Sequence, residues 1–122
     1  MPHPVHLDLS IAASALAALG HETRLAVYRL LVEAGEGGLQ PGRIADALKL
    51  PASSLSFHLM HLQHAGLVSH RREGRGLIYT TRYDVMEALV GYLLENCCRG
   101  AGGECAPSPV RPRKAVKTKA EA

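Results

Sequence analysis

The three cysteines of the chain, Cys97, Cys98 and Cys105, fall within nine residues, directly after an amphipathic segment. Cys97 and Cys98 are neighbours, so their Cα atoms lie about 3.8 Å apart, closer than the roughly 4.4–6.8 Å of a relaxed disulfide. Glycines between Cys98 and Cys105 allow the backbone to fold back and bring the third thiol toward the pair. This spacing predicts three thiolates that can converge on one soft ion.

The 122 residues suit a single domain whose modest core would gain from a partner subunit. We expect a folded domain over residues 1–106 and a disordered basic tail over 107–122, which is rich in proline, alanine and lysine. No apolar run approaches the roughly 20 residues of a membrane span, and the first residues lack the pattern of a signal peptide. We therefore expect a cytoplasmic protein without a membrane segment, in a compartment that keeps thiols reduced.

The net charge of +3 comes from the end of the chain, because residues 111–119 carry five basic side chains. Nine basic and ten acidic residues remain over positions 1–106, so the predicted domain is nearly neutral. A nucleic-acid surface must then be a local cluster of cations. The only dense cluster before the tail consists of Arg71, Arg72, Arg75 and Arg82.

Hydrophobic periodicity and turn residues predict five helices and one β-hairpin. The helices are expected over residues 7–19, 21–34, 41–48, 52–65 and from 83 to 96 or to the cysteines, and the strands over 67–72 and 77–82. The fold class is mainly α with a small β-hairpin. Helix, tight turn, helix and hairpin in this order are typical of a winged helix-turn-helix.

Apolar spacing also predicts which face of each helix is buried. In the first helix Leu9, Ala12, Leu16 and Leu19 recur at helical spacing with alanines between them, and in the second we expect Leu25, Tyr28, Leu31 and Val32 on the buried face. In the helix over 52–65, Leu55, Leu59 and Leu62 are expected in the core. The opposite side of that helix carries Phe57 beside serines and histidines, a composition that favours a binding face.

Several stretches resemble the ArsR/SmtB family of metal-responsive repressors over roughly residues 8–98. They are Ala18-Leu-Gly-His-Glu-Thr-Arg-Leu25, Arg43-Ile-Ala-Asp-Ala-Leu48, Ser54-Leu-Ser-Phe-His-Leu, the Ala65-Gly-Leu-Val68 run and the charged hairpin with Arg72-Glu-Gly-Arg75. The resemblance implies a homodimer that joins through its first and last helices. It also implies a transcriptional repressor whose two recognition helices read a palindromic operator in double-stranded DNA.

The winged helix-turn-helix places the helix over 52–65 in the major groove and the hairpin tip on the backbone. Serine hydroxyls can reach phosphates or bases, an aromatic ring can pack on a thymine methyl group, and arginines contact phosphates. We therefore predict DNA contacts by Ser53, Ser54, Ser56, Phe57, His61, Arg71, Arg72 and Arg75. The alternative is that these side chains form an ordinary solvated surface.

Two metal sites of the resembled family are excluded by composition. Residues 39–48 lack the Cys-x-Cys pair that many members carry there, and the last helix has Asp84 but no histidine. The cluster Cys97, Cys98 and Cys105 looks like that of family members that sense trivalent arsenic. The resemblance then implies that the apo dimer binds DNA and that As(III) or Sb(III), as inducer bound to the three thiolates, releases it.

Other functions remain open on the same residues. Soft thiolates also bind zinc, cadmium or lead, although zinc prefers a fourth ligand, and a cysteine pair could instead sense oxidants by forming a disulfide. A metalloid-binding carrier is an alternative of another class.

We expect no enzyme, because no acid–base pair, no nucleophile with a spaced histidine and no His-Glu-x-x-His motif occurs. His58, His61 and His64 repeat every three residues and drift around the helix, which disfavours a shared metal.

Overall fold

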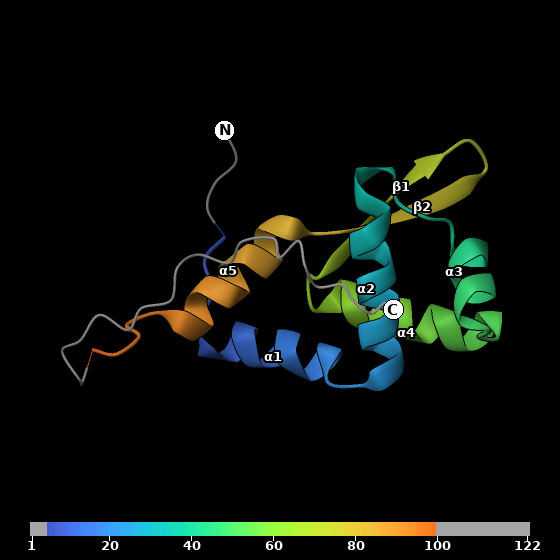
Figure 1. The fold of residues 1–122 in the computed structure, drawn as a ribbon. Coiled ribbons are helices and arrows are strands. Elements are labelled where there is room, and N and C mark those ends of the chain that lie inside the picture. Colours follow the sequence, from blue (N-terminus) through green and yellow to red (C-terminus); the bar gives the residue numbers. More distant parts are fainter. Residues whose placement is uncertain (1–4, 100–122) are drawn as a thin grey trace, which may run out of the picture.

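A computed structural model describes residues 5–99 of the protein. Its elements are α1 (Leu9–Leu19), α2 (Glu22–Ala34), the 3-10 helix η1 (Gly35–Gly37), α3 (Pro41–Leu48), α4 (Ala52–His64), β1 (Val68–Glu73), β2 (Gly76–Thr81) and α5 (Tyr83–Leu94). This order confirms the predicted winged helix-turn-helix: α3 and α4 form the helix pair, and β1 and β2 form the wing (Figure 1). The expected tail over 107–122 and Cys105 lie outside the described residues.

The helices begin and end at residues whose chemistry suits those positions. Asp8 caps α1 by accepting a hydrogen bond from the Ile11 amide at 2.9 Å. His21 does the same for α2 through its Nδ1, which lies 3.2 Å from the Thr23 amide. Pro41 occupies the first turn of α3, where its missing N–H costs nothing. These ends agree with the predicted boundaries within one or two residues.

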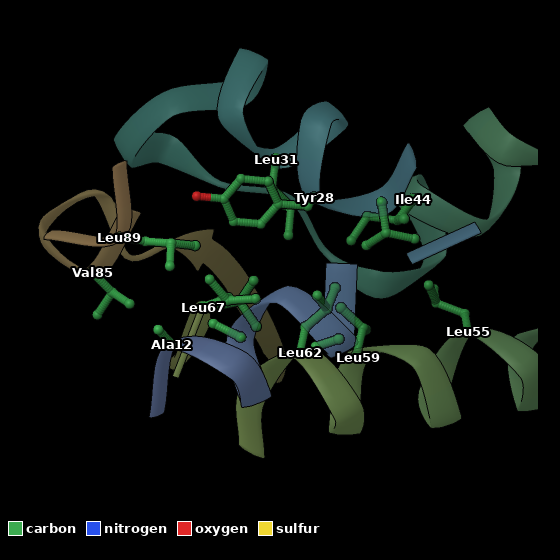
Figure 2. Packing of buried hydrophobic residues seen from close by; sticks show 14 residues of the cluster. Ala12, Tyr28, Leu31, Ile44, Leu55, Leu59, Leu62, Leu67, Val85 and Leu89 are labelled. Atoms are coloured by element: carbon green, nitrogen blue, oxygen red, sulfur yellow. The ribbon is translucent and has the colours of Figure 1, made fainter. Parts of the chain in front are cut away.

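The core lies where α2, α4, α5 and the start of the wing meet (Figure 2). Leu55, Leu59 and Leu62 of α4 are buried, as predicted, and pack with Leu31 of α2 and Leu67. Burying each such side chain stabilises the fold by about 1.5–3 kcal/mol. The core therefore determines the rotation of α4 about its axis.

The predicted buried face of α2 is partly wrong, and in α1 only the alanines of the apolar pattern are fully buried. Ala12, Ala15 and Ala18 are the buried residues of α1, whereas Leu9 is 74% exposed and Leu16 is 42% exposed. The periodicity could not separate the two faces because this helix is apolar on both sides, and small alanines let it pack closely against its neighbours. Leu9 and Leu16 therefore lie on the surface of the described subunit.

In α2, Val27 is buried together with the predicted Tyr28 and Leu31, but Leu25 and Val32 lie at the surface. Leu25 lines a shallow surface depression between α2 and α3 with Arg29, Leu30 and Leu48. The helix α2 has more apolar side chains than fit on the face that packs against the core, so Leu25 and Val32 remain exposed.

The wing is a regular antiparallel hairpin with Val68 opposite Thr81 and Glu73 opposite Gly76. Two residues, Gly74 and Arg75, connect the strands, and Gly74 has the positive φ of 61° that tight hairpin turns require. An additional bridge joins Leu39 to Tyr79, with backbone hydrogen bonds of 2.9 and 3.1 Å. The sequence did not predict this bridge, which ties the wing to the segment ahead of α3.

The last helix is shorter than predicted, because α5 ends at Leu94 and Glu95 is already extended with ψ 135°. Asn96 follows at φ 61°, a left-handed conformation that asparagine tolerates better than most residues. The two cysteines thus lie on turns beyond the helix and not on its end. None of the helices within residues 5–99 has the length and apolar character to cross a membrane.

Gly38 permits the close approach of the wing, and this leads to a prediction. It has φ 66°, and a Cβ added there would meet the Tyr79 carbonyl oxygen and the methyl groups of Ile78 and Thr80 at less than 3.0 Å. We expect Gly38→Ala to lower the free energy of unfolding by about 2 kcal/mol or more, measured by urea denaturation. The control Gly37→Ala, where no atom lies within 4 Å, should change it by less than about 0.5 kcal/mol. Equal effects of the two substitutions would contradict this packing.

Candidate nucleic-acid interface and thiol turn

The outer face of α4 presents most of the predicted DNA contacts together. Ser53, Ser56 and Phe57 are exposed, and Ser54 and His61 are half-buried. The three leucines hold the opposite side of the helix in the core, so steps of 100° per residue direct the serines and Phe57 to solvent. The helix thus offers hydroxyl groups and one large apolar ring on one surface.

Phe57 is held in position by its neighbours although 52% of it is exposed. Its ring centroid lies 4.5 Å from that of His61 and 6.0 Å from that of His58, both in edge-on geometry. Such aromatic pairs contribute about 0.5–1.5 kcal/mol each beyond burial. The exposed ring is therefore preorganised, as expected of a residue that contacts a partner.

The hairpin separates the three predicted wing arginines. Arg71 lies opposite the buried Ile78, on the inner face of the wing. Its guanidinium pairs with Glu73 at 2.8 Å and approaches the Glu36 and Gly37 carbonyl oxygens at 3.3 and 3.4 Å. Neighbouring strand residues point to opposite faces, so Arg72 points outward, and Arg75 occupies the exposed tip.

Arg82, the fourth member of the basic cluster, is partly neutralised. It donates two hydrogen bonds to the Asp84 carboxylate, at 3.0 and 3.3 Å. This pairing raises the pKa of Arg82 and lowers the pKa of Asp84. The outward positive charge of the wing therefore rests on Arg72 and Arg75.

His58, His61 and His64 have three different surroundings. The His58 ring lies 5.0 Å from the His21 ring, and its Nδ1 is buried without a hydrogen-bond partner among the described residues. His61 contacts Phe57, and His64 is exposed. No group of three His, Cys, Asp or Glu side chains suited to a metal ion occurs within residues 5–99.

His61 and His64 also line an open cleft of about 310 Å³ between α1, α2 and the end of α4. Ser14, Ala17 and Ala18 form its α1 wall, and Arg24 of α2 completes it together with Ala65. The sequence analysis did not single out Arg24 or Ser14, whereas His64 was considered only with His58 and His61 as a possible ligand trio. The spacing of His61 and His64 indicated that both lie near one face of α4. The sequence pattern could not predict that α1 and α2 approach this face and form a cleft with it.

The cysteines at the end of α5 lie close together on a left-handed turn. The Sγ atoms of Cys97 and Cys98 are 3.5 Å apart, and both residues are half-buried. Successive side chains diverge by about 100° on a helix, but Cys98 has φ 63°, which brings the two thiol groups to the same side. Cys98 is disulfide-bonded, and the predicted third ligand, Cys105, lies outside the described part of the chain.

The Cys98 sulfur can act as a thiolate ligand only after its disulfide is reduced. With metal–sulfur bonds of about 2.3 Å, as for zinc, sulfur atoms 3.5 Å apart would then subtend about 100° at a shared ion. This angle is close to the tetrahedral angle of about 109°. The separation of the two sulfur atoms is therefore compatible with a shared soft ion after reduction.

Comparisons with known proteins agree with the winged helix-turn-helix fold. A family model described as a helix-turn-helix domain matches residues 19–71. The nodulation protein NolR of Rhizobium meliloti is 32% identical over 93 residues, which cover 76% of this chain and 74% of NolR.

Solved structures are similar as well. The homodimeric winged helix-turn-helix domain of Mb0332 from Mycobacterium bovis, a possible ArsR-family regulator, has 28% identity and a TM-score of 0.59, over 79% of this chain and 89% of that domain. A possible transcriptional regulator for arsenical resistance has 26% identity and a TM-score of 0.58, over 66% and 80% of the two chains.

The surroundings of His58 lead to a prediction on stability. Burial, and then the neighbouring His21, Arg24 and His61, lower the pKa of His58 below its ordinary value. The unfolded chain binds this proton more readily, so the free energy of unfolding should decline as the pH falls below about 6.5. We expect His58→Gln to reduce this decline, measured by urea denaturation between pH 7.5 and 5.5. The exposed His6→Gln variant serves as control; an unchanged pH profile in His58→Gln would contradict the assignment.

Proposed function

The chain belongs to the helix-turn-helix transcriptional regulators of the ArsR type, and we propose that it is a repressor that As(III) releases from DNA. In this proposal, a homodimer without bound ion occupies a palindromic operator. As(III) or Sb(III) then binds Cys97, Cys98 and Cys105 and favours an arrangement of the dimer that cannot hold the DNA. The 3.5 Å separation of the first two sulfur atoms is the observation that carries the proposal.

The DNA-binding part of the proposal draws on the exposed face of α4 and on the wing. Phe57 and the serines are turned away from the core, while Arg72 and Arg75 are exposed on the hairpin beside α4. In a dimer, two such surfaces contact half-sites about 34–36 Å apart. The serines and wing arginines would position the protein on phosphates, and Phe57 would contact a base edge.

The dimer part draws on α1 and α5, which lie at the same end of the fold (Figure 1). Leu9, Ile11 and Leu16 of α1 and Leu93 and Leu94 of α5 are all exposed in the single subunit. An apolar patch of this kind marks an interface with another protein. The related domain from Mycobacterium bovis is homodimeric, which supports the same assembly here.

The position of the thiol turn explains how an ion would affect the dimer. Leu93 and Leu94 come directly before it, and the Cys97 amide donates to the Leu94 carbonyl oxygen at 3.0 Å. Closing three thiolates around one ion would change the backbone of this turn and so the apolar surface next to it. Release requires only that the ion bind the DNA-incompetent arrangement more tightly, typically by about 1–3 kcal/mol or more.

A redox-responsive repressor is the second candidate, and the disulfide at Cys98 favours it. Oxidation of two thiols to a disulfide, with the two electrons and two protons taken up by an oxidant such as peroxide, would also restrain the chain after α5. We prefer the As(III) proposal because three thiolates in one short segment exceed what a single disulfide needs, and because a similar structure is described as a possible regulator for arsenical resistance.

Cysteine variants test the sensor. In reducing buffer, arsenite should release a fluorescently labelled operator from the wild-type dimer, followed by fluorescence anisotropy. Cys98→Ser and Cys105→Ser should each require at least about tenfold more arsenite, because each removes one of three ligands. Without arsenite, both variants should bind the operator as the wild type does.

The same titration separates the two candidates. Release by peroxide but not by arsenite would establish the redox function in place of the proposed one. Metal analysis of the loaded dimer should find one arsenic atom for each subunit if each site is formed within one chain.

The wing arginines provide a separate test of DNA binding. Arg72→Ala and Arg75→Ala should weaken binding to specific and random duplexes alike and flatten the salt dependence, because each removes a phosphate contact. The logarithmic slope should change by about 0.9 for each phosphate lost. Arg43→Ala, on α3, is a charge-matched comparison outside the wing. Affinities that stay unchanged at every salt concentration would exclude a role for the wing.

A further inference from the structure

The cleft between α1, α2 and the end of α4 gathers groups that can bind an anion. Arg24, His61, His64 and Ser14 line it, and among the described residues no carboxylate does. His58 is close enough to sense these groups, because burial and then the positive charges of His21, Arg24 and His61 lower the pKa of His58. Without a negative partner, these groups repel one another when protonated.

Arg24 is fixed at the back of this cleft. Its Nε donates to the Ala18 carbonyl oxygen at 2.6 Å, near the end of α1. That bond orients the guanidinium and leaves its two terminal amino groups as donors for a ligand. Arginine in this arrangement suits the bidentate recognition of a phosphate group.

The cleft is continuous with the outer face of α4. His61 lines the cleft and at the same time contacts Phe57, with ring centroids 4.5 Å apart. His64 is exposed one turn further along the helix. A duplex that lies against Phe57 therefore passes the mouth of the cleft. The α1 wall consists of small side chains, Ser14, Ala17 and Ala18, which allow a sugar–phosphate backbone to come close.

We propose that this cleft binds a backbone phosphate of the operator, held by Arg24, His61, His64 and the Ser14 hydroxyl. The inference rests on the proposed DNA-binding function and extends the interface beyond α4 and the wing to α1 and α2. Two of the donors are imidazole rings, whose N–H groups can donate hydrogen bonds to phosphate oxygens.

The test uses the full-length dimer and a labelled operator duplex selected from random DNA with the wild-type protein. Arg24→Gln should lose one phosphate contact in each subunit, so the slope of log affinity against log salt should flatten by about 1.8 for the dimer. Arg29→Gln is the matched control, because Arg29 lies on the same helix but lines the depression on its other side. Its slope should equal that of the wild type.

A second pair of variants covers the case in which Arg24→Gln fails to fold. Ser14 and Ser10 are both exposed on α1, and only Ser14 lines the cleft. Ser14→Asp places a carboxylate against the phosphate and should weaken operator binding at least about tenfold, whereas Ser10→Asp should have a much smaller effect. Sedimentation equilibrium verifies that both variants remain dimeric.

The outcomes are distinguishable. If the wild type selects no duplex, the proposed function itself fails. If it binds a selected operator, but the salt slope of Arg24→Gln and the affinity of Ser14→Asp equal those of their controls, the cleft does not contact DNA. Dissociation of the Ser14→Asp dimer would assign the cleft to the subunit interface instead. Inorganic phosphate that shifts the His64 imidazole resonances of the free protein, without any change in the DNA slopes, would make it a site for a free anion and overturn the proposal.

Discussion

The burial of Leu55, Leu59 and Leu62 on one side of α4 is the contact on which the rest of this molecule depends. Three buried leucines contribute roughly 5–9 kcal/mol, comparable with the whole net stability of a small domain. A rotation of α4 would expose them, so the helix has one permitted orientation. That orientation turns Phe57 and the serines outward and places His61 at the junction with α1 and α2. The surface proposed to read DNA is therefore a consequence of how the core is packed.

The proposed sensor lies where the regular structure ends. The helix α5 is anchored in the core by Val85 and Leu89, and the Tyr83 hydroxyl donates to the Val32 carbonyl oxygen of α2 at 3.0 Å. Beyond Leu94 the backbone continues in turns, two of which include residues with positive φ. The neighbours of this segment, Leu93 and Leu94, belong to the exposed apolar surface, so on our proposal a local change at the thiols would alter the dimer contact.

In this nearly neutral domain, some of the clustered arginines form ion pairs with carboxylates and others stay exposed to solvent. Arg71 and Arg82 form ion pairs with Glu73 and Asp84 and stabilise the wing and the start of α5. Exposed pairs of this kind contribute little stability, about 0–1 kcal/mol. Their carboxylates nevertheless offset the positive charge of two of the four clustered arginines. The remaining cations are Arg72 and Arg75 on the wing and, on our proposal, Arg24 with two histidines in the cleft. The proposed DNA surface thus carries its positive charge in two separate positions, on the wing and in the cleft.

The order of the elements, the buried side of α4 and the candidate thiols could be predicted from the sequence, because each is a local property of spacing, capping and turn residues. Glycine and proline mark where helices begin and end. Leucines three and four residues apart lie on one face of a helix, independently of what packs against it. Other features required the tertiary structure. The alanine face of α1 and the exposure of Leu9 and Leu16 depend on how closely a neighbouring helix can approach, which an apolar pattern on both sides of a helix does not encode. The inward position of Arg71, the bridge from Leu39 to Tyr79 and the meeting of Arg24 with His61 and His64 join residues far apart in the chain. Spacing along the chain decides which residues share a helix face, but only packing decides which faces meet.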